Sequence, residues 1–333
     1  MATLLAALAM LGSGCGGAAM TARPANVDGT TPSPGGVVSG AFKGPEGERA
    51  WRLYVPTHAA APRTLLVLLH GCLQTAADIA AGSRMDAVAE EQGFLVLYPE
   101  QDIAANPRRC WNWFEPAHQG RDAGEPRLLA ALVADVAQQH GVDPQRIHVA
   151  GISAGAGMAG LLAVAYPERF ATLSLVSGVA WRVATNVGRA LAVMKDGGGS
   201  AVPPPTAVID AMGPRARAIP ALVIHGDKDA SLHPRNGEEA VVQWVGVHNL
   251  LRARSALPVL QESTTQSRTE NGYEVTEQTW PDDRGRSVVT FIRVAGLGHA
   301  WSGGSAKGSF ADERGPDASR RIAALMSAHP VLR

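Results

Sequence analysis

The fold of this chain is decided by residues 146–160, which read RIHVAGISAGAGMAG. Residues 146–150 are a short, largely apolar stretch typical of a buried strand, and residues 161–166 favour a helix. Ser153 therefore lies on a glycine-flanked turn between a strand and a helix. This G-x-S-x-G pattern predicts a strained turn that presents the serine hydroxyl above the sheet, at the positive end of the helix.

A second pattern overlaps the first, because residues 155–160 also fit the dinucleotide-binding motif G-x-G-x-x-G. That motif needs its first glycine directly after the strand and an acidic residue about 20 positions later. Here the serine turn intervenes, and residues 174–180 contain no Asp or Glu. We therefore expect no nucleotide cofactor. Nucleophilic catalysis by a serine requires no metal, so we expect no metal or other cofactor either.

The composition is that of a globular protein with an ample core. The 333 residues are 46% hydrophobic and 18% charged, which allows one large α/β domain or two small ones. The formal net charge is zero and no basic stripe occurs, which disfavours nucleic-acid binding. The body of the chain has no apolar run of about 20 residues, so we expect no transmembrane span, and we expect a monomer.

The N-terminus has the features of an export signal. Its first 20 residues are rich in Ala and Leu and contain no charged residue. We predict a signal peptide over residues 1–22, a linker over 23–35 and one catalytic domain over 36–333. Residues 11–15 resemble a lipoprotein cleavage site, so a lipid anchor at Cys15 is an open alternative to plain secretion. The expected location is extracellular or periplasmic.

Strands alternate with helices through the rest of the chain. Strands are predicted at residues 35–42, 50–55, 63–70, 93–99, 146–150, 171–177, 220–225, 273–280 and 287–294, and helices at 83–92, 126–140, 161–166, 237–254 and 317–328. Residues 178–219 are predicted to be an irregular, mobile or lid-like insertion, because they contain triple glycine and triple proline. The order predicts an α/β fold with a doubly wound, mostly parallel sheet and helices on both faces.

A serine nucleophile needs a base and an acid, which follow it in the order Ser, acid, His in α/β hydrolases. His299 lies on a glycine-rich loop directly after the last strand and is the candidate base. Asp227 and Asp229 follow the strand that ends at residue 225. Asp229 is the better candidate acid, because Asp227 lies nearest the strand end, where it is expected to bind turn amides.

The loop after the first central strand contains His70-Gly71-Cys72. The N–H groups of Cys72 and Ala154 are the candidate oxyanion donors, which together contribute several kcal/mol to transition-state stabilisation. We expect His70 to shape this loop without acting as a base. If Cys15 is removed or lipidated, Cys72 and Cys110 remain, and such a pair in an exported protein indicates either one disulfide or two free thiols.

Five motifs occur in an order that resembles the catalytic domain of the poly(3-hydroxybutyrate) depolymerase family of esterases, within the α/β-hydrolase superfamily. They are LHGCLQT (69–75), CWNWF (110–114), GISAG (151–155), HGDKD (225–229) and GHAW (298–301), and the resemblance covers about residues 37–329. It implies a triad of Ser153, Asp229 and His299 with oxyanion donors at Cys72 and Ala154. It also implies a disulfide between Cys72 and Cys110 that would tie the oxyanion loop (residues 70–72) to the tryptophan loop (residues 110–114).

The resemblance implies a serine esterase acting on poly- or oligo(3-hydroxybutyrate) or related short-chain esters. Only about 30 residues follow His299, whereas polymer-degrading relatives usually append a polymer-binding domain. Feruloyl and acetylxylan esterases have related catalytic domains and remain an alternative. Trp301 is the best candidate for a pocket residue, and Trp111 and Trp113 line the pocket or pack in the core. A peptidase or acyltransferase using the same triad, or a non-catalytic exported binding protein on the same fold, also remains open.

Overall fold

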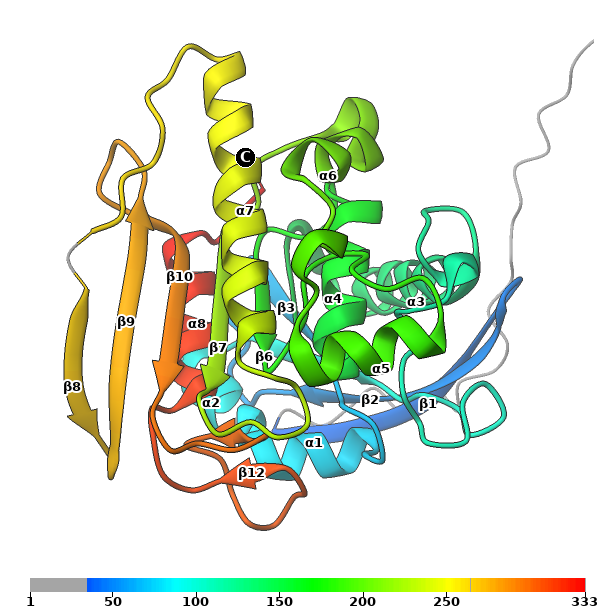
Figure 1. Ribbon diagram of the computed structural model, residues 1–333. Coiled ribbons are helices and arrows are strands. Elements are labelled where there is room, and N and C mark those ends of the chain that lie inside the picture. Colours follow the sequence, from blue (N-terminus) through cyan, green and yellow to red (C-terminus); the bar gives the residue numbers. More distant parts are fainter. Residues whose placement is uncertain (1–34, 264, 333) are drawn as a thin grey trace, which may run out of the picture.

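The computed structural model describes residues 35–263 and 265–332 (Figure 1). The predicted signal peptide with Cys15, and the predicted linker except for its last residue, lie outside the described residues. Ten strands form one sheet in the order β1-β2-β4-β3-β5-β6-β7-β10-β9-β8. The strands are β1 (Gly36–Gly44), β2 (Gly47–Val55), β3 (Arg63–Leu69), β4 (Leu95–Pro99), β5 (Val142–Ile152), β6 (Leu173–Val176), β7 (Ala221–Gly226), β8 (Gln266–Glu270), β9 (Tyr273–Pro281) and β10 (Ser287–Val294).

Six neighbouring strands, from β4 to β10 in the sheet order, pair in parallel. Antiparallel strands complete the sheet, with β1 and β2 at one edge and β9 and β8 at the other. This topology confirms the predicted α/β, mostly parallel sheet. A small second sheet pairs β11 (Trp301–Ser302) with β12 (Ala311–Asp312).

Helices cover both faces of the large sheet (Figure 1). One face carries α3 (Gly124–Gln139), α4 (Ala154–Ala165), α5 (Val187–Asp196), α6 (Pro205–Met212) and α7 (Arg235–Arg254), and the other carries α1 (Ala76–Ser83), α2 (Met85–Gln92) and α8 (Ala318–Ala328). Alternate residues of β3 supply the two cores, since Leu65 and Val67 pack on one side and Leu66 and Leu68 on the other. No helix of the described residues is long and apolar enough to span a membrane.

One expectation about local structure was wrong, and two elements were missed. Residues 178–219 are not an irregular insertion, because they contain α5 and α6. Their glycines and prolines mark the ends of these helices: Gly197 caps the C-terminus of α5, and Pro205 is the first residue of α6. The helix expected at 83–92 is present as α2, but the helix before it, α1, was missed; Arg84, whose φ is 56°, separates the two. Strand β8 was not predicted, because its residues are polar and at most half buried.

The parallel strands bring loops from distant parts of the sequence to one edge of the sheet. The loops that follow β3, β5, β7 and β10 contain Cys72, Ser153, Asp229 and His299 respectively. Because the carboxyl ends of parallel strands meet at the same edge, that edge of the sheet collects every residue that the sequence selected for catalysis.

Glycines at the start of α4 let the helix approach the sheet backbone. A Cβ added to Gly155 would lie 2.3 Å from the carbonyl oxygen of Leu69 and 2.4 Å from that of His70. A Cβ on Gly151 would lie 2.4 Å from the backbone of Gly155. These positions therefore exclude any side chain. Gly160 differs, because a Cβ there would meet no atom within 4 Å.

We predict opposite effects for two alanine substitutions in α4. Gly155→Ala should lower the free energy of unfolding by about 2–3 kcal/mol, because strand β3 must shift to admit the methyl group. Gly160→Ala should raise it by about 0.5–1 kcal/mol, because alanine favours the helix and no atom obstructs it. Urea unfolding measures both values, and equal effects of the two substitutions would contradict the close approach at Gly155.

Candidate active site

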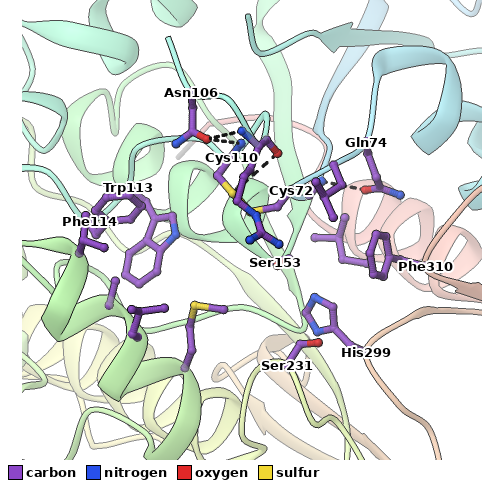
Figure 2. A pocket seen from close by; sticks show the side chains of 18 of the residues that line it. Cys72, Gln74, Asn106, Cys110, Trp113, Phe114, Ser153, Ser231, His299 and Phe310 are labelled. Atoms are coloured by element: carbon purple, nitrogen blue, oxygen red, sulfur yellow. Dashed lines mark hydrogen bonds between the residues drawn. A yellow bond between two sulfur atoms is a disulfide. The ribbon is translucent and has the colours of Figure 1, made fainter. Parts of the chain in front are cut away.

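Ser153 lies between β5 and α4 in a strained backbone conformation. Its φ is 56° and its ψ is −123°, a combination that residues other than glycine rarely adopt. Its N–H donates a hydrogen bond to the carbonyl of Val176 at 3.0 Å, which ties the turn to strand β6. Ser153 is half buried and lines a cavity with His299 (Figure 2). The turn has the geometry that the G-x-S-x-G pattern predicted.

Asp229 and His299 form a hydrogen-bonded pair. Nδ1 of His299 lies 2.7 Å from Oδ2 of Asp229, and both side chains are largely buried. A carboxylate only accepts hydrogen bonds, so the imidazole must carry its proton on Nδ1. In the neutral ring Nε2 is then unprotonated and able to accept a proton.

The carboxylate of Asp229 is held by its own loop. Oδ1 accepts hydrogen bonds from the N–H groups of Ser231 at 2.9 Å and Leu232 at 2.7 Å. Nε2 of His225 lies 3.4 Å from Oδ2 and 2.9 Å from the carbonyl of Leu232. Burial by itself would raise the pKa of Asp229, but the hydrogen bonds from His225 and His299 outweigh it and hold the pKa well below its usual range. Asp229 therefore stays ionised next to His299.

Asp227 has a structural role. Its Oδ1 accepts a hydrogen bond from the N–H of Gly296 at 2.7 Å, and its own N–H donates to the carbonyl of Val294 at 3.1 Å. Asp227 thus joins the loops after β7 and β10, and it does not contact His299. The structure brings Asp229, and not Asp227, to the histidine.

The oxyanion loop lies against the serine turn. A Cβ on Gly71 would lie 3.3 Å from Cβ of Ser153, and Cys72 lines the same cavity as the serine. The N–H of Cys72 donates no hydrogen bond to any atom of residues 35–263 and 265–332. Ala154 is the first residue of α4, so its N–H has no acceptor within the helix. Two backbone donors are therefore available beside Ser153.

A disulfide joins Cys72 to Cys110, across 38 residues of sequence (Figure 2). It connects the oxyanion loop to the tryptophan loop, as the family resemblance implied. The buried Glu125 holds the tryptophan loop by accepting hydrogen bonds from the N–H of Asn112 at 2.8 Å and from its side-chain amide at 2.9 Å. The two loops are thus fixed by a covalent bond and by a buried carboxylate.

His70 is a structural residue of the oxyanion loop. Nδ1 donates to the carbonyl of Gly71 at 2.7 Å, and Nε2 accepts from the N–H of Gln101 at 3.0 Å. Burial lowers the pKa of His70 to about 4, so the ring stays neutral near pH 7. With both nitrogens occupied, His70 has no lone pair to offer Ser153, in agreement with the sequence interpretation.

The cavity over Ser153 has a volume of about 660 Å³ and mainly apolar walls. Its lining includes Leu73, Cys110, Trp113 and Phe114, and α5 contributes Val187, Ala190, Leu191 and Met194. Phe310 stands edge-on to the ring of His299, with the ring centroids 6.0 Å apart (Figure 2). The described residues contain no group of three potential metal ligands.

Two of the three tryptophans expected in the pocket lie elsewhere. Trp301 is fully buried between the sheet and α8, and its Nε1 donates to the hydroxyl of Ser319 at 3.1 Å. Trp111 is fully buried in the other core, and its Nε1 donates to the carbonyl of His70 at 3.1 Å. Each indole thus finds its partner inside the protein, away from the cavity. Only Trp113 lines the cavity.

Other cavity residues were missed by sequence reasoning. Val187, Leu191 and Met194 have the spacing i, i+4, i+7 of one helix face, which was a detectable signal in a segment predicted to be irregular. Phe310 and Arg108 lie on loops without periodicity, so no sequence pattern indicated them.

Known proteins match the chain along most of this fold. The model of the family described as "Esterase PHB depolymerase" matches residues 49–263. Poly(3-hydroxyalkanoate) depolymerase C of Paucimonas lemoignei is 30% identical over 254 residues, which are 74% of this chain and 57% of that protein. A probable acetylxylan esterase A of Neosartorya fischeri is 30% identical over 216 residues, which are 59% of this chain and 54% of that protein. The chain therefore spans little more than half the length of these two relatives.

A solved structure agrees with the fold. An acetyl xylan esterase from Aspergillus awamori superimposes with a TM-score of 0.64 at 24% identity, covering 80% of this chain and 94% of that one. At this identity the similarity concerns the fold alone, whereas the family match extends over the serine turn and Asp229. The chain belongs to the esterase PHB depolymerase family.

Proposed function

We propose that this protein is a serine carboxylic-ester hydrolase that cleaves aliphatic oligo- or polyesters of the 3-hydroxybutyrate type through an acyl-enzyme. The observation that carries the proposal is the hydrogen bond between Asp229 and His299, because the ring of His299 lines the apolar cavity that contains Ser153. The family and the named relatives support ester hydrolysis. The disulfide supports the expected export, because such bonds persist in oxidising compartments.

In the first half of the reaction, Nε2 of His299 takes the proton of the Ser153 hydroxyl as Oγ attacks the ester carbonyl carbon. The N–H groups of Cys72 and Ala154 stabilise the oxyanion that forms. His299 then protonates the departing alcohol oxygen, which leaves the acyl group on Ser153. Asp229 keeps the proton on Nδ1 and stabilises the charged imidazolium.

In the second half, His299 takes a proton from water, and the hydroxide attacks the acyl carbonyl in the same oxyanion hole. The tetrahedral intermediate collapses, Oγ of Ser153 leaves, and His299 returns its proton to that oxygen. The products are a carboxylate and the regenerated enzyme.

The shape and polarity of the cavity favour a polyester over an acetylated sugar. An acetyl group would leave most of a 660 Å³ cavity empty, whereas a short hydroxyalkanoate chain would cover its apolar walls. Acetylxylan esterase is the second candidate, favoured by the names of relatives. Feruloyl esters remain an alternative, because Trp113 and Phe114 supply aromatic surface.

Replacing the nucleophile tests the reaction type. Ser153→Ala should lower kcat for p-nitrophenyl butyrate by roughly 10⁴–10⁶-fold, because the acyl-enzyme can no longer form on Oγ of residue 153. It should also abolish labelling by a fluorophosphonate probe. Ser231→Ala is the matched control, since Ser231 lines the same cavity and its loss should leave the labelling intact. A folded Ser153→Ala protein that is still labelled would contradict the assignment and favour another nucleophile.

The choice of acid is tested by two isosteric substitutions. Asp229→Asn should lower kcat by about 10³–10⁴-fold, because an amide NH₂ facing Nδ1 forces the proton onto Nε2. Asp227→Asn should have a far smaller effect, because the amide oxygen can still accept the hydrogen bond from Gly296. The measurement is kcat for p-nitrophenyl butyrate in both variants. A larger loss of kcat in Asp227→Asn would identify Asp227 as the acid.

A substrate panel separates the ester classes. We expect kcat/KM to rise about 10-fold from p-nitrophenyl acetate to p-nitrophenyl butyrate, because two further methylene groups are buried. Among natural esters, hydroxybutyrate oligomers or polyhydroxybutyrate film should be cleaved faster than acetylated xylan or feruloyl esters. Preference for acetylated xylan, with no gain from acetate to butyrate, would favour the second candidate.

A further inference from the structure

The cavity over Ser153 carries a positive charge that the ester reaction does not use. Of the described residues that line it, only Arg108 and His299 have ionisable side chains, and no Asp or Glu is among them. His299 belongs to the proposed triad. Arg108 is therefore a permanent cation in a mainly apolar wall, in a position to contact whatever the cavity binds.

Arg108 differs from the arginine next to it. Arg109 is paired, because its Nη1 lies 3.0 Å from Oε1 of Glu100 and 3.3 Å from the carbonyl of Gln101. No hydrogen bond or ion pair of the Arg108 guanidinium is assigned anywhere in the described part of the chain. The side chain of Arg108 is exposed at the cavity, so its five N–H donors remain available to a ligand.

The backbone of Arg108 is fixed close to the oxyanion loop. Its N–H donates to Oδ1 of Asn106 at 3.0 Å, and its carbonyl accepts from the N–H of Leu73 at 2.7 Å. Two residues later, Cys110 is bonded to Cys72 (Figure 2). Arg108 is thus tied twice to the segment that carries the candidate oxyanion donor. A group bound by the guanidinium shares the cavity with the ester carbonyl at Ser153.

We propose that Arg108 forms an anion subsite that binds the free carboxylate at the acid end of an oligoester, so that the protein prefers acid-terminated oligomers. This inference rests on the proposed function and specifies its substrate. Each cleavage of a hydroxyalkanoate chain leaves a fragment that ends in a carboxylate, so the expected ligand is a product of the reaction itself. A guanidinium matches a carboxylate with two parallel hydrogen bonds.

The subsite is tested first by inhibition of p-nitrophenyl butyrate hydrolysis, with hexanoate and its neutral counterpart hexanamide as competitive inhibitors. In the wild type we expect the ratio of the Ki of hexanamide to the Ki of hexanoate to be about five, because the carboxylate gains an accessible ion pair. High salt should reduce this ratio. The ratio should fall to one or below in Arg108→Gln and remain in part in Arg108→Lys. Arg109→Gln is the matched control and should keep the wild-type ratio.

The second arm compares the linear 3-hydroxybutyrate trimer with its methyl ester, which has the same chain but no charge. The wild type should have a KM about fivefold lower for the free acid, and Arg108→Gln should remove this difference. Equal KM values in the wild type, or a difference that survives in Arg108→Gln, would overturn the inference. Because every comparison is a ratio within one variant, a general loss of activity or stability does not imitate the result.

Failure of the proposed function has a different signature. If the Ser153→Ala protein keeps its activity, the serine mechanism is wrong whatever Arg108 does. If the wild type cleaves neither trimer, the oligoester substrate is wrong and the preference for acid-terminated oligomers falls with it. In that case, a ratio of the two Ki values that falls in Arg108→Gln would support only the anion subsite.

Discussion

The close contact between the start of α4 and the end of β3 is the constraint on which the site depends. Gly155 lies against the carbonyls of Leu69 and His70, where no side chain fits. The turn at Ser153, which has a positive φ, joins β5 to α4 at this contact, and the first N–H groups of α4 lie beside the oxyanion loop. The strain of the turn, of order 1–3 kcal/mol, is offset by the buried sheet and helix on either side.

A buried polar network fixes the other wall of the site. The network connects the end of β3 to the tryptophan loop. The N–H of Gln101 donates to His70, and its side-chain amide donates to Glu125 and to the carbonyl of Cys110. The disulfide adds a covalent connection between the same two segments. Because buried polar groups that lose a partner cost about 1–3 kcal/mol each, this network holds the loops in one arrangement. It therefore gives the cavity at Ser153 a fixed shape before substrate arrives.

The wall formed by α5 shows where sequence reasoning fails. Triple glycine and triple proline indicated an irregular insertion, yet these residues only mark where α5 and α6 end and begin. The α5 residues were missed, whereas Trp301 was wrongly expected in the pocket because it is a large aromatic residue two positions from His299; it is in fact buried in the core. Its direction is set by α8, which provides an apolar surface and the hydroxyl of Ser319. No local pattern contains that information.

The sequence by itself determined the parallel strands of the sheet, the turn at Ser153 and the order of Ser153, Asp229 and His299, because glycine spacing and strand periodicity are local properties. It also reduced the acid to Asp227 or Asp229, through the residues that follow β7. Only the tertiary structure decided which carboxylate meets His299, which tryptophan reaches the cavity, and that Arg108 faces it. Those outcomes depend on loops from separate strands meeting at one edge of the sheet, and on the packing between them, which act between residues far apart in the chain.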